Sequence, residues 1–332
     1  MSEFKGVLIC GEMVEGNLSS ITTEALGCGR QLADKLSEDL LCVLISDQLG
    51  DAPNKAIAHG ADKVLTVEDP LLKEYQTDSY VAVMEKVSKD VSPRIVLFGQ
   101  TSVGRDLAPR LAFRLGVGLS MDCLELDINS DTKLLEQNRA VYGGNARAIF
   151  TTDSLPQMAA VRQKAMSPLV PDESRKGEVV SIKVDLDPAQ IRTKVLETVK
   201  EEVAGIKLED AEVVISGGRG IGGPEGFKQL EELAKMLKGA VGASRPPCDN
   251  GWMPETVQVG LTGKLVTPDV YIAVAISGAS QHLSGCSGSK NIIAINRDPE
   301  ANIFKEARFG VVGDWKQVLP ALTEKVKELL AS

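Results

Sequence analysis

Short apolar runs alternate with amphipathic segments through the first half of the chain. Four of these runs have the length of a buried strand: residues 6–10, 40–45, 63–67 and 94–99. Apolar positions also recur at spacings of three and four, from Leu26 to Leu36 and again over residues 80–87, which is the period of a helix. Continuous apolar strands alternating with helices predict a parallel sheet covered on both faces. We expect the extended stretches of residues 119–161 to complete this sheet.

The same alternation restarts near residue 211 and continues to the end of the chain. Further strands are expected over residues 211–216, 240–243, 257–259, 270–276, 291–295 and 310–313. Helices are expected over residues 224–237 and 315–330. The predicted fold class is therefore α/β, with two parallel-sheet domains of which the C-terminal one is Rossmann-like.

Composition changes between residues 165 and 207. Pro168, Pro171 and Pro188 occur there, together with runs of charged residues. Proline and charged residues are typical of a solvent-exposed connection between domains. We therefore predict an N-terminal domain of residues 1–205, which includes this linker of about 165–207, and a C-terminal domain of residues 206–332.

The excess of acidic over basic residues limits the kinds of partner that we expect the chain to bind. The sequence has 37 Lys and Arg against 46 Asp and Glu, a formal net charge of −9. Nucleic acid is not an expected partner, because phosphate binding depends on clustered basic residues. The apolar runs are too short to cross a bilayer, and the first one begins at Gly6 without a leader ahead of it. We expect a cytoplasmic protein that does not insert into a membrane.

Cysteine and histidine offer little scope for metal or disulfide chemistry. The six cysteines include no Cys-x-x-Cys pair, so we expect reduced, structural thiols. His59 and His282 are the only histidines, and neither has a second ligand at metal-site spacing. The sequence also has no Ser-His-Asp or Cys-His arrangement with a separate acid, which argues against a hydrolase. We assign no metal ligand and no catalytic residue.

A glycine-rich loop follows the first strand of the second domain. It has the spacing Gly218-x-Gly220-x-x-Gly223, and Pro224 then begins a helix. Such a loop lets backbone amides approach a pyrophosphate, although this spacing alone fits a tight structural turn about as well. Arg219 adds a cation that a purely structural turn does not need. The next strand ends in Arg245 and not in the acid of an NAD site, so an ordinary nicotinamide site is not predicted.

Polar residues follow other strands of the same domain. They include Thr262, Ser277 to His282, Asn296 and Asp314. Ligands of open parallel sheets collect at the carboxyl ends of the strands, so this distribution favours a cofactor site there.

Each of these residues also has an ordinary structural explanation. Arg245 could be a solvated surface cation, although no carboxylate partner is obvious nearby in the sequence. Thr262 could cap a turn, and His282 could be a core histidine with satisfied hydrogen bonds. Asp314 lies just before Trp315 and is as well placed to cap a helix as to bind a ribose.

Five ordered motifs in the second domain resemble those of electron transfer flavoprotein alpha subunits. They are Ser216-Gly-Gly-Arg-Gly, Val241-Gly-Ala-Ser-Arg245, Gln258-Val-Gly-Leu-Thr-Gly-Lys264, Ile276-Ser-Gly-Ala-Ser-Gln-His282 and Ala294-Ile-Asn-Arg-Asp-Pro-Glu300. The first domain is similar to the family through Gly99-Gln-Thr-Ser-Val-Gly-Arg-Asp-Leu-Ala-Pro109, Tyr142-Gly-Gly-Asn-Ala146 and Pro156-Gln-Met-Ala. The resemblance covers nearly the whole chain.

The resemblance implies one FAD bound across the second domain. The residues implied as cofactor-binding are Arg219, Ser244, Arg245, Gln258, Val259, Gly260, Leu261, Thr262, Ser277, Gly278, Ala279, Ser280, Gln281, His282, Asn296, Asp314 and Trp315. The ADP part would lie near Asn296 and Asp314, and the pyrophosphate near Arg219.

The implied environment of the flavin ring would tune its chemistry. By resemblance, Arg245 is the cation beside the ring, His282 the donor to its C2 carbonyl and Thr262 the hydroxyl bonded to N5. Together they would favour an anionic flavin and make it an electron carrier. Leu261 stands where many relatives carry Gln, so one polar contact near the flavin is missing or moved.

The resemblance also implies partners. The first domain would contact a beta subunit, giving a heterodimer that carries electrons one at a time from flavin dehydrogenases of the acyl-CoA dehydrogenase type, as in fatty acid beta-oxidation, to a downstream acceptor. An alternative is the alpha subunit of an electron-bifurcating flavoprotein that uses NADH and ferredoxin. An NAD-binding enzyme of a related superfamily and a nucleotide-sensing module also remain open. We expect the chain to be an electron transfer protein and not a stand-alone enzyme.

Overall fold

The computed structural model describes residues 4–144, 146–198 and 206–331. The chain divides into two compact units. Unit 1 consists of residues 1–141 and 146–199, and unit 2 consists of residues 142–145 and 200–332. The predicted boundary at residue 205 lies outside the described residues.

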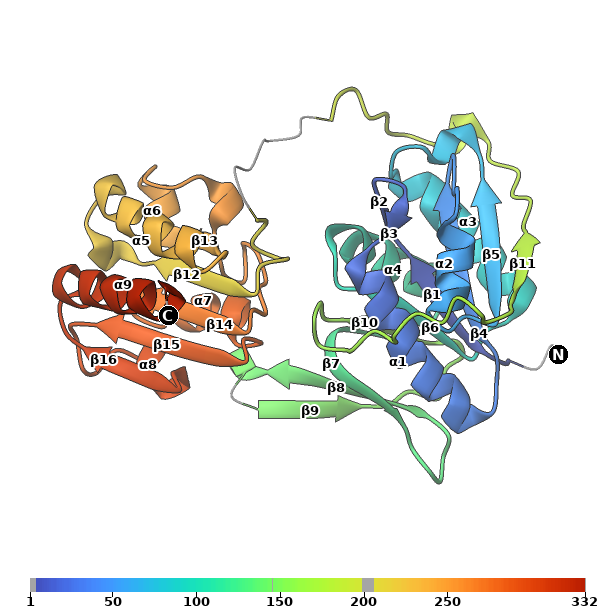
Figure 1. Ribbon diagram of the computed structural model, residues 1–332. Coiled ribbons are helices and arrows are strands. Elements are labelled where there is room, and N and C mark those ends of the chain that lie inside the picture. The colour runs from blue at the N-terminus through green and yellow to red at the C-terminus, as the bar shows by residue number, and fades with distance from the viewer. Residues whose placement is uncertain (1–3, 145, 199–205, 332) are drawn as a thin grey trace. The chain divides into compact units, whose positions relative to one another are not determined.

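Unit 1 is built on a nine-stranded sheet (Figure 1). Its strands are β1 (Val7–Gly11), β4 (Leu40–Ser46), β5 (Lys63–Glu68), β6 (Ile95–Gly99), β7 (Leu119–Ile128), β8 (Leu135–Val141), β9 (Ala146–Phe150), β10 (Gln157–Val161) and β11 (Glu178–Ser181). They lie in the order β11-β5-β4-β1-β6-β10-β7-β8-β9. The short strands β2 (Met13–Val14) and β3 (Asn17–Leu18) form a separate antiparallel pair.

The helices of unit 1 connect parallel strands, as the alternation predicts. They are α1 (Ser20–Leu36), α2 (Ala52–Ala58), α3 (Thr77–Val91) and α4 (Ser102–Leu115). Ser19 caps α1 by accepting from the Thr22 N–H, and Thr101 caps α4 by accepting from the Gly104 N–H. Separate apolar cores fill the two faces of the central strands. The predicted strands at residues 6–10, 40–45, 63–67 and 94–99 are thus confirmed within one or two residues.

Two parts of unit 1 differ from the expected picture. The sheet is not wholly parallel, because β8 pairs antiparallel with both β7 and β9. The expected linker of residues 165–207 also contributes a strand, β11, which pairs in parallel with β5 from Glu178 to Ser181. Describing this whole segment as a connection was therefore wrong: apolar Val179 and Val180 allow one edge strand among the charged residues.

Unit 2 has a five-stranded parallel sheet in the order β13-β12-β14-β15-β16. The strands are β12 (Val213–Gly217), β13 (Ala240–Ala243), β14 (Val270–Val274), β15 (Asn291–Asn296) and β16 (Phe309–Val312). The helices are α5 (Pro224–Met236), α6 (Arg245–Asp249), α7 (Ser280–Cys286), α8 (Ile303–Glu306) and α9 (Trp315–Ala331). This strand order is that of a doubly wound sheet, as predicted.

The two faces of this sheet are buried in separate cores. Successive strand residues alternate between them: Tyr271 and Ala273 face one core, and Ile272 and Val274 face the other. The predicted strand at residues 257–259 was wrong. This segment is a short 3₁₀ turn, Glu255–Val257, followed by isolated bridges that hold Gln258 and Val259.

Candidate functional site

The candidate site lies where the chain leaves β12 and β14. These neighbouring strands are the point at which the strand order of unit 2 reverses, because β13 follows on one side and β15 on the other. Connections depart in opposite directions there and leave a crevice at the carboxyl ends. The glycine loop after β12 and the Ala275–Ser277 segment after β14 form its floor. The sheet order thus explains why polar residues far apart in the sequence meet.

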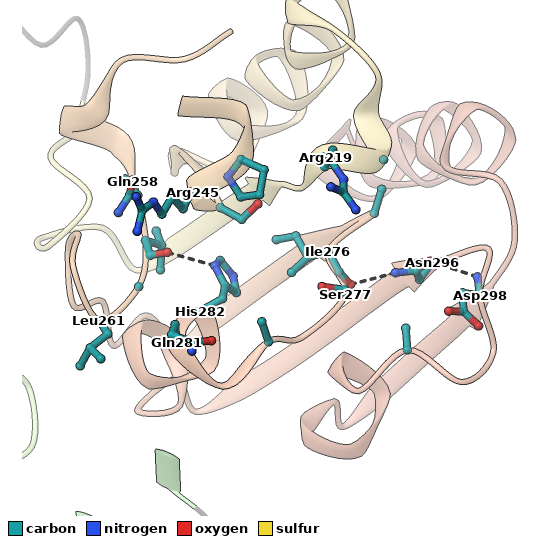
Figure 2. A pocket seen from close by; sticks show the side chains of 18 of the residues that line it. Arg219, Arg245, Gln258, Leu261, Ile276, Ser277, Gln281, His282, Asn296 and Asp298 are labelled. Atoms are coloured by element: carbon teal, nitrogen blue, oxygen red, sulfur yellow. Dashed lines mark hydrogen bonds between the residues drawn. The ribbon is translucent and has the colours of Figure 1, made fainter. Parts of the chain in front are cut away.

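A cavity of about 630 Å³ opens at this crevice (Figure 2). Its walls combine cations, hydroxyls, amides and glycine backbone. The lining residues are Arg219, Gly220, Ser244, Arg245, Pro246, Gln258, Val259, Gly260, Leu261, Thr262, Ala275, Ile276, Ser277, Ala279, Gln281, His282, Asn296, Arg297, Asp298 and Ala301. Convergent polar groups, with arginine as the main charged residue among them, suit a large polar cofactor that carries negative charge.

The floor of the cavity depends on close backbone packing. A Cβ on Gly218 would lie 2.1 Å from the carbonyl oxygen of Ala275, and one on Gly220 would lie 2.9 Å from the Ala275 Cβ. Ala275 has a φ of 54°, which is uncommon for a residue with a side chain. Its amide donates to the Ile295 carbonyl, which holds it in that conformation. Ala275 thus packs directly against the glycine loop and leaves no room for a side chain at Gly218 or Gly220.

His282 lies at the start of α7, in the cavity wall (Figure 2). Its Nδ1 is 3.0 Å from the Val259 carbonyl oxygen, and its Nε2 is 3.0 Å from the Tyr271 hydroxyl oxygen. The side chain is 6% exposed, and burial lowers its pKa to about 4, although the Val259 bond acts in the opposite direction. The ring is therefore neutral near pH 7. It has the satisfied hydrogen bonds of a core histidine and still borders the site.

Thr262 and Gln258 form a second polar unit of the wall. The Gln258 amide donates to the Thr262 hydroxyl oxygen at 3.1 Å, which leaves the hydroxyl hydrogen available to another acceptor. Gln258 is buried and Thr262 is exposed. Leu261 lies between Gly260 and Thr262 and is 58% exposed, with its side chain directed away from the cavity centre (Figure 2).

The environment of Arg245 corrects one expectation. A carboxylate partner is present nearby in the sequence: Asp249, one helical turn later in α6, accepts from Arg245 Nε at 3.2 Å. The two side chains are 67% and 57% exposed. This ion pair was not predicted because the helix α6 was not predicted. Pro246 and Pro247 hide the helical pattern of that segment. Arg245 still lines the cavity, as does Arg219.

A smaller hollow of about 170 Å³ borders the same floor and is lined by two more of the expected residues, Asp314 and Trp315. It shares Gly220, Ala275, Asn296 and Arg297 with the main cavity, and Asp314 and Trp315 form its far side. Two of these residues also have structural roles. The Asp314 carboxylate accepts from the Lys316 amide at the start of α9, and the buried Trp315 donates to the Gly220 carbonyl at 3.1 Å.

Most of the expected cofactor residues thus meet around one crevice. Gly278 and Ser280 are outside the lining of both hollows. Residues that the sequence analysis did not assign are Gly220, Pro246, Ala275, Ile276, Arg297, Asp298 and Ala301. Arg297 and Asp298 directly follow Asn296, so their position after a predicted strand was the available signal. Ala275 carried no signal, because its unusual φ depends on the folded sheet.

The residues present fit an FAD. Arg219 and Arg297 supply positive charge near the glycine loop, where Gly218 and Gly220 leave backbone room for a pyrophosphate. The main cavity and the smaller hollow lie next to each other and share Asn296 in their linings, which suits an elongated dinucleotide.

In residues 4–144, 146–198 and 206–331, no cluster of three or more His, Cys, Asp or Glu side chains could hold a metal ion. Across the same ranges, none of the helices combines the length and apolar character needed to span a membrane. The six cysteines are buried free thiols.

Comparison with known proteins identifies the family. Residues 7–187 match the electron transfer flavoprotein domain, and residues 207–287 match the electron transfer flavoprotein FAD-binding domain. The chain is 44% identical over 330 residues to the electron transfer flavoprotein subunit alpha of Thermoanaerobacterium thermosaccharolyticum, covering 99% of this chain and 100% of that protein. It is 43% identical over 331 residues to the subunit of the same name from Megasphaera elsdenii, covering 99% and 98%. It is also 40% identical over 333 residues to Protein FixB of Clostridium saccharobutylicum, covering 100% and 99%. The chain therefore belongs to the family of electron transfer flavoprotein alpha subunits, and its second unit is an FAD-binding domain.

Proposed function

We propose that this chain holds one FAD in the crevice of unit 2 and acts, as a heterodimer with a beta subunit, as an electron carrier. It would take electrons from flavin dehydrogenases of the acyl-CoA dehydrogenase type and pass them singly to a downstream acceptor. The observation that carries the proposal is the crevice at the β12–β14 switch point, lined by Arg219, Arg245 and His282.

The chain's own residues would bind and orient the cofactor. Bound FAD supplies the redox chemistry, which the side chains of the site cannot perform alone. Arg219 and the glycine loop would hold the pyrophosphate, and Asn296 and Asp314 would border the adenosine part. Thr262, with its hydroxyl oriented by Gln258, would donate toward the ring. Arg245 would place a positive charge beside it, and the neutral ring of His282, whose Nδ1 is bonded to Val259, would border it.

The test is the cofactor content of the purified complex. Co-expression with a beta subunit is expected to give a 1:1 heterodimer with a flavin absorption spectrum and one FAD released from this chain's site. Variants in unit 2, such as Arg219→Ala, are expected to lower that FAD content without separating the subunits.

Two outcomes would contradict parts of the proposal. Stoichiometric NAD without flavin in the gently purified heterodimer would exclude the carrier function. Reduction of the complex by NADH together with ferredoxin reduction, and not by an acyl-CoA dehydrogenase with its substrate, would replace the proposed electron donor with that of a bifurcating complex.

A further inference from the structure

The ring of His282 is held at both of its nitrogens. Nδ1 lies 3.0 Å from the Val259 carbonyl oxygen, and Nε2 lies 3.0 Å from the Tyr271 hydroxyl. Val259 lines the cavity, whereas Tyr271 is fully buried in β14 and does not. The ring therefore stands between the site and the core of unit 2, with one nitrogen bonded on each side.

The chemistry of the two partners determines where the protons lie. A carbonyl oxygen can only accept, so Nδ1 must carry a hydrogen. Because burial lowers the pKa of His282 to about 4, the ring has only one N–H near neutral pH. Nε2 is then an acceptor, and Tyr271 must donate its hydroxyl hydrogen to it. The donor and the acceptor of both hydrogen bonds therefore follow from two facts: the Val259 carbonyl can only accept, and the ring is neutral.

The hydroxyl of Tyr271 is itself fixed in place. It lies in a fully buried part of the core that also contains Cys286, and no water reaches it. Tyr271 is paired in register with Val214 of β12 and Ile292 of β15, so its backbone is held at the centre of the sheet. A buried tyrosine anchored in this way can define the position of a neighbouring ring.

We propose that Tyr271 is a positioning residue of the flavin site: its hydroxyl holds His282 in one orientation and one tautomer, so that the Nδ1–H stays bonded to the carbonyl of Val259 in the cavity wall. The inference rests on the proposed function, because His282 and the Val259 backbone that it bonds both border the cavity proposed for FAD. Turning the ring over would exchange each nitrogen with a carbon and break both bonds. Without the hydroxyl, only the Val259 bond opposes that rotation, and Nε2 would be left buried without a donor.

The first test measures the tautomer directly and does not require electron transfer. His59 and His282 are the only histidines, so labelling the chain with ¹⁵N-histidine gives two rings, and His59→Gln assigns them. In the complex, with FAD and after its removal, the His282 signals are expected to show a protonated Nδ1 and an unprotonated Nε2. In Tyr271→Phe, these signals are expected to shift or broaden because the ring samples other states.

The second test measures whether Tyr271 acts through His282. Because the ring borders the cavity, Tyr271→Phe is expected to change the equilibrium constant for the first one-electron reduction of FAD about threefold to tenfold, which is about 28–59 mV at 59 mV per tenfold. In a His282→Ala background, the same substitution is expected to change the potential little. Tyr80→Phe is the matched control, because it removes a partly buried hydroxyl from unit 1.

Three results would overturn the proposal. One is a wild-type His282 protonated at Nε2 alone. A second is a Tyr271→Phe variant whose ring signals and potential both equal those of the wild type. The third is an equal potential shift with and without His282, which is the behaviour of a merely structural tyrosine. If Tyr271→Phe does not fold, the tautomer of His282 measured in the wild-type chain still tests the proposal. A complex without FAD would contradict the proposed function, whereas the ring signals of the flavin-free chain would still test Tyr271.

Discussion

Arg245 is shared between the cavity and a carboxylate. Its Nε bonds to Asp249, and its side chain is 67% exposed, so solvent weakens its field at the site. A hydrogen bond involving a charged group contributes about 1.5–3 kcal/mol when it is well shielded. Because of the exposure and the competing carboxylate, we expect the lower end of that range or less here.

We predict that Arg245→Ala lowers the first reduction potential of bound FAD by about 65 mV or less, which corresponds to about 1.5 kcal/mol. Asp249→Asn should have the opposite sign, because it frees the guanidinium and removes a negative charge. The measurement is a redox titration at low and high salt. In the Arg245→Ala background, Asp249→Asn should lose most of its effect. An unmoved potential in Arg245→Ala with FAD still bound would make Arg245 an ordinary surface cation.

Thr262 offers a cleaner test of the ring's surroundings, because its side chain is exposed and removing it costs the fold little. Thr262→Ala is predicted to change the FAD absorption spectrum and potential, since both the hydroxyl and the acceptor of the Gln258 amide are lost. Thr262→Ser keeps the hydroxyl and is the control. Equal spectra for the alanine and serine variants would leave Thr262 with only a turn role.

At the residue scale, the sequence predicted which residue types gather at the site but not what they bond to. His282 and Arg245 were expected at the cavity, and both line it. Their partners, Tyr271 and Asp249, lie one strand and one helical turn away. The first depends on the sheet register and the second on a five-residue helix that begins with prolines, neither of which has a strong local pattern.

The elements of unit 2 meet most closely where β12 passes the end of β14. Gly218 lies in an extended conformation, so its need for glycine comes from packing and not from backbone angle. Its missing side chain allows contact with the Ala275 carbonyl, at the floor of the site. At Gly223, five residues later, an added Cβ would meet no atom within 4 Å, and φ is again extended.

This contrast gives a matched pair of variants. Gly218→Ala is predicted to destabilise the chain by about 1–3 kcal/mol, because the new Cβ forces the two strand ends apart. It should also weaken FAD binding. Gly223→Ala meets no atom and should cost only the poorer N-cap, about 0.5–1 kcal/mol, and should keep FAD. Urea unfolding and FAD titration of both variants check this. Similar losses in both would show that the loop needs glycine for flexibility and not for close packing.

Elements with strong periodicity were predictable, and those that depend on pairing were not. The apolar run that forms β14 and the amphipathic face of α5 are local signals, and both elements are present. The segment 257–259 was expected to be a strand, but only Gln258 and Val259 are bridged, to Ala243 and Lys264 respectively. β11 lies in a proline-rich, charged segment and becomes a strand because the edge of β5 is available to it. These outcomes are decided by tertiary pairing.

At the scale of the whole molecule, the two units bury acids and bases differently. In unit 1, burial raises the pKa of Glu12 and of Glu24 to about 7, against weaker opposing hydrogen bonds from Thr101 and Lys164. In unit 2, burial lowers the pKa of His282 to about 4. The folded form of unit 1 thus binds protons more readily than the unfolded chain between about pH 7 and 4.5, and unit 2 does the reverse between about pH 6.5 and 4.

The units are therefore predicted to respond to mild acid with opposite signs. Between pH 7.5 and 5, unit 1 should gain stability as Glu12 and Glu24 take up protons in the folded state. Unit 2 should lose about 2 kcal/mol by pH 5, because the unfolded chain protonates His282 and the folded one does not. Hydrogen exchange of β1 and β14 peptides in the FAD-loaded complex, corrected for the intrinsic effect of pH on exchange, separates the two responses. Replacing both Glu12 and Glu24 by Gln keeps their acceptor oxygens and should flatten the response of unit 1 while leaving that of unit 2. If both units lost protection in parallel as the pH falls, this assignment would be wrong. The titration of some other group would then control the stability of both units.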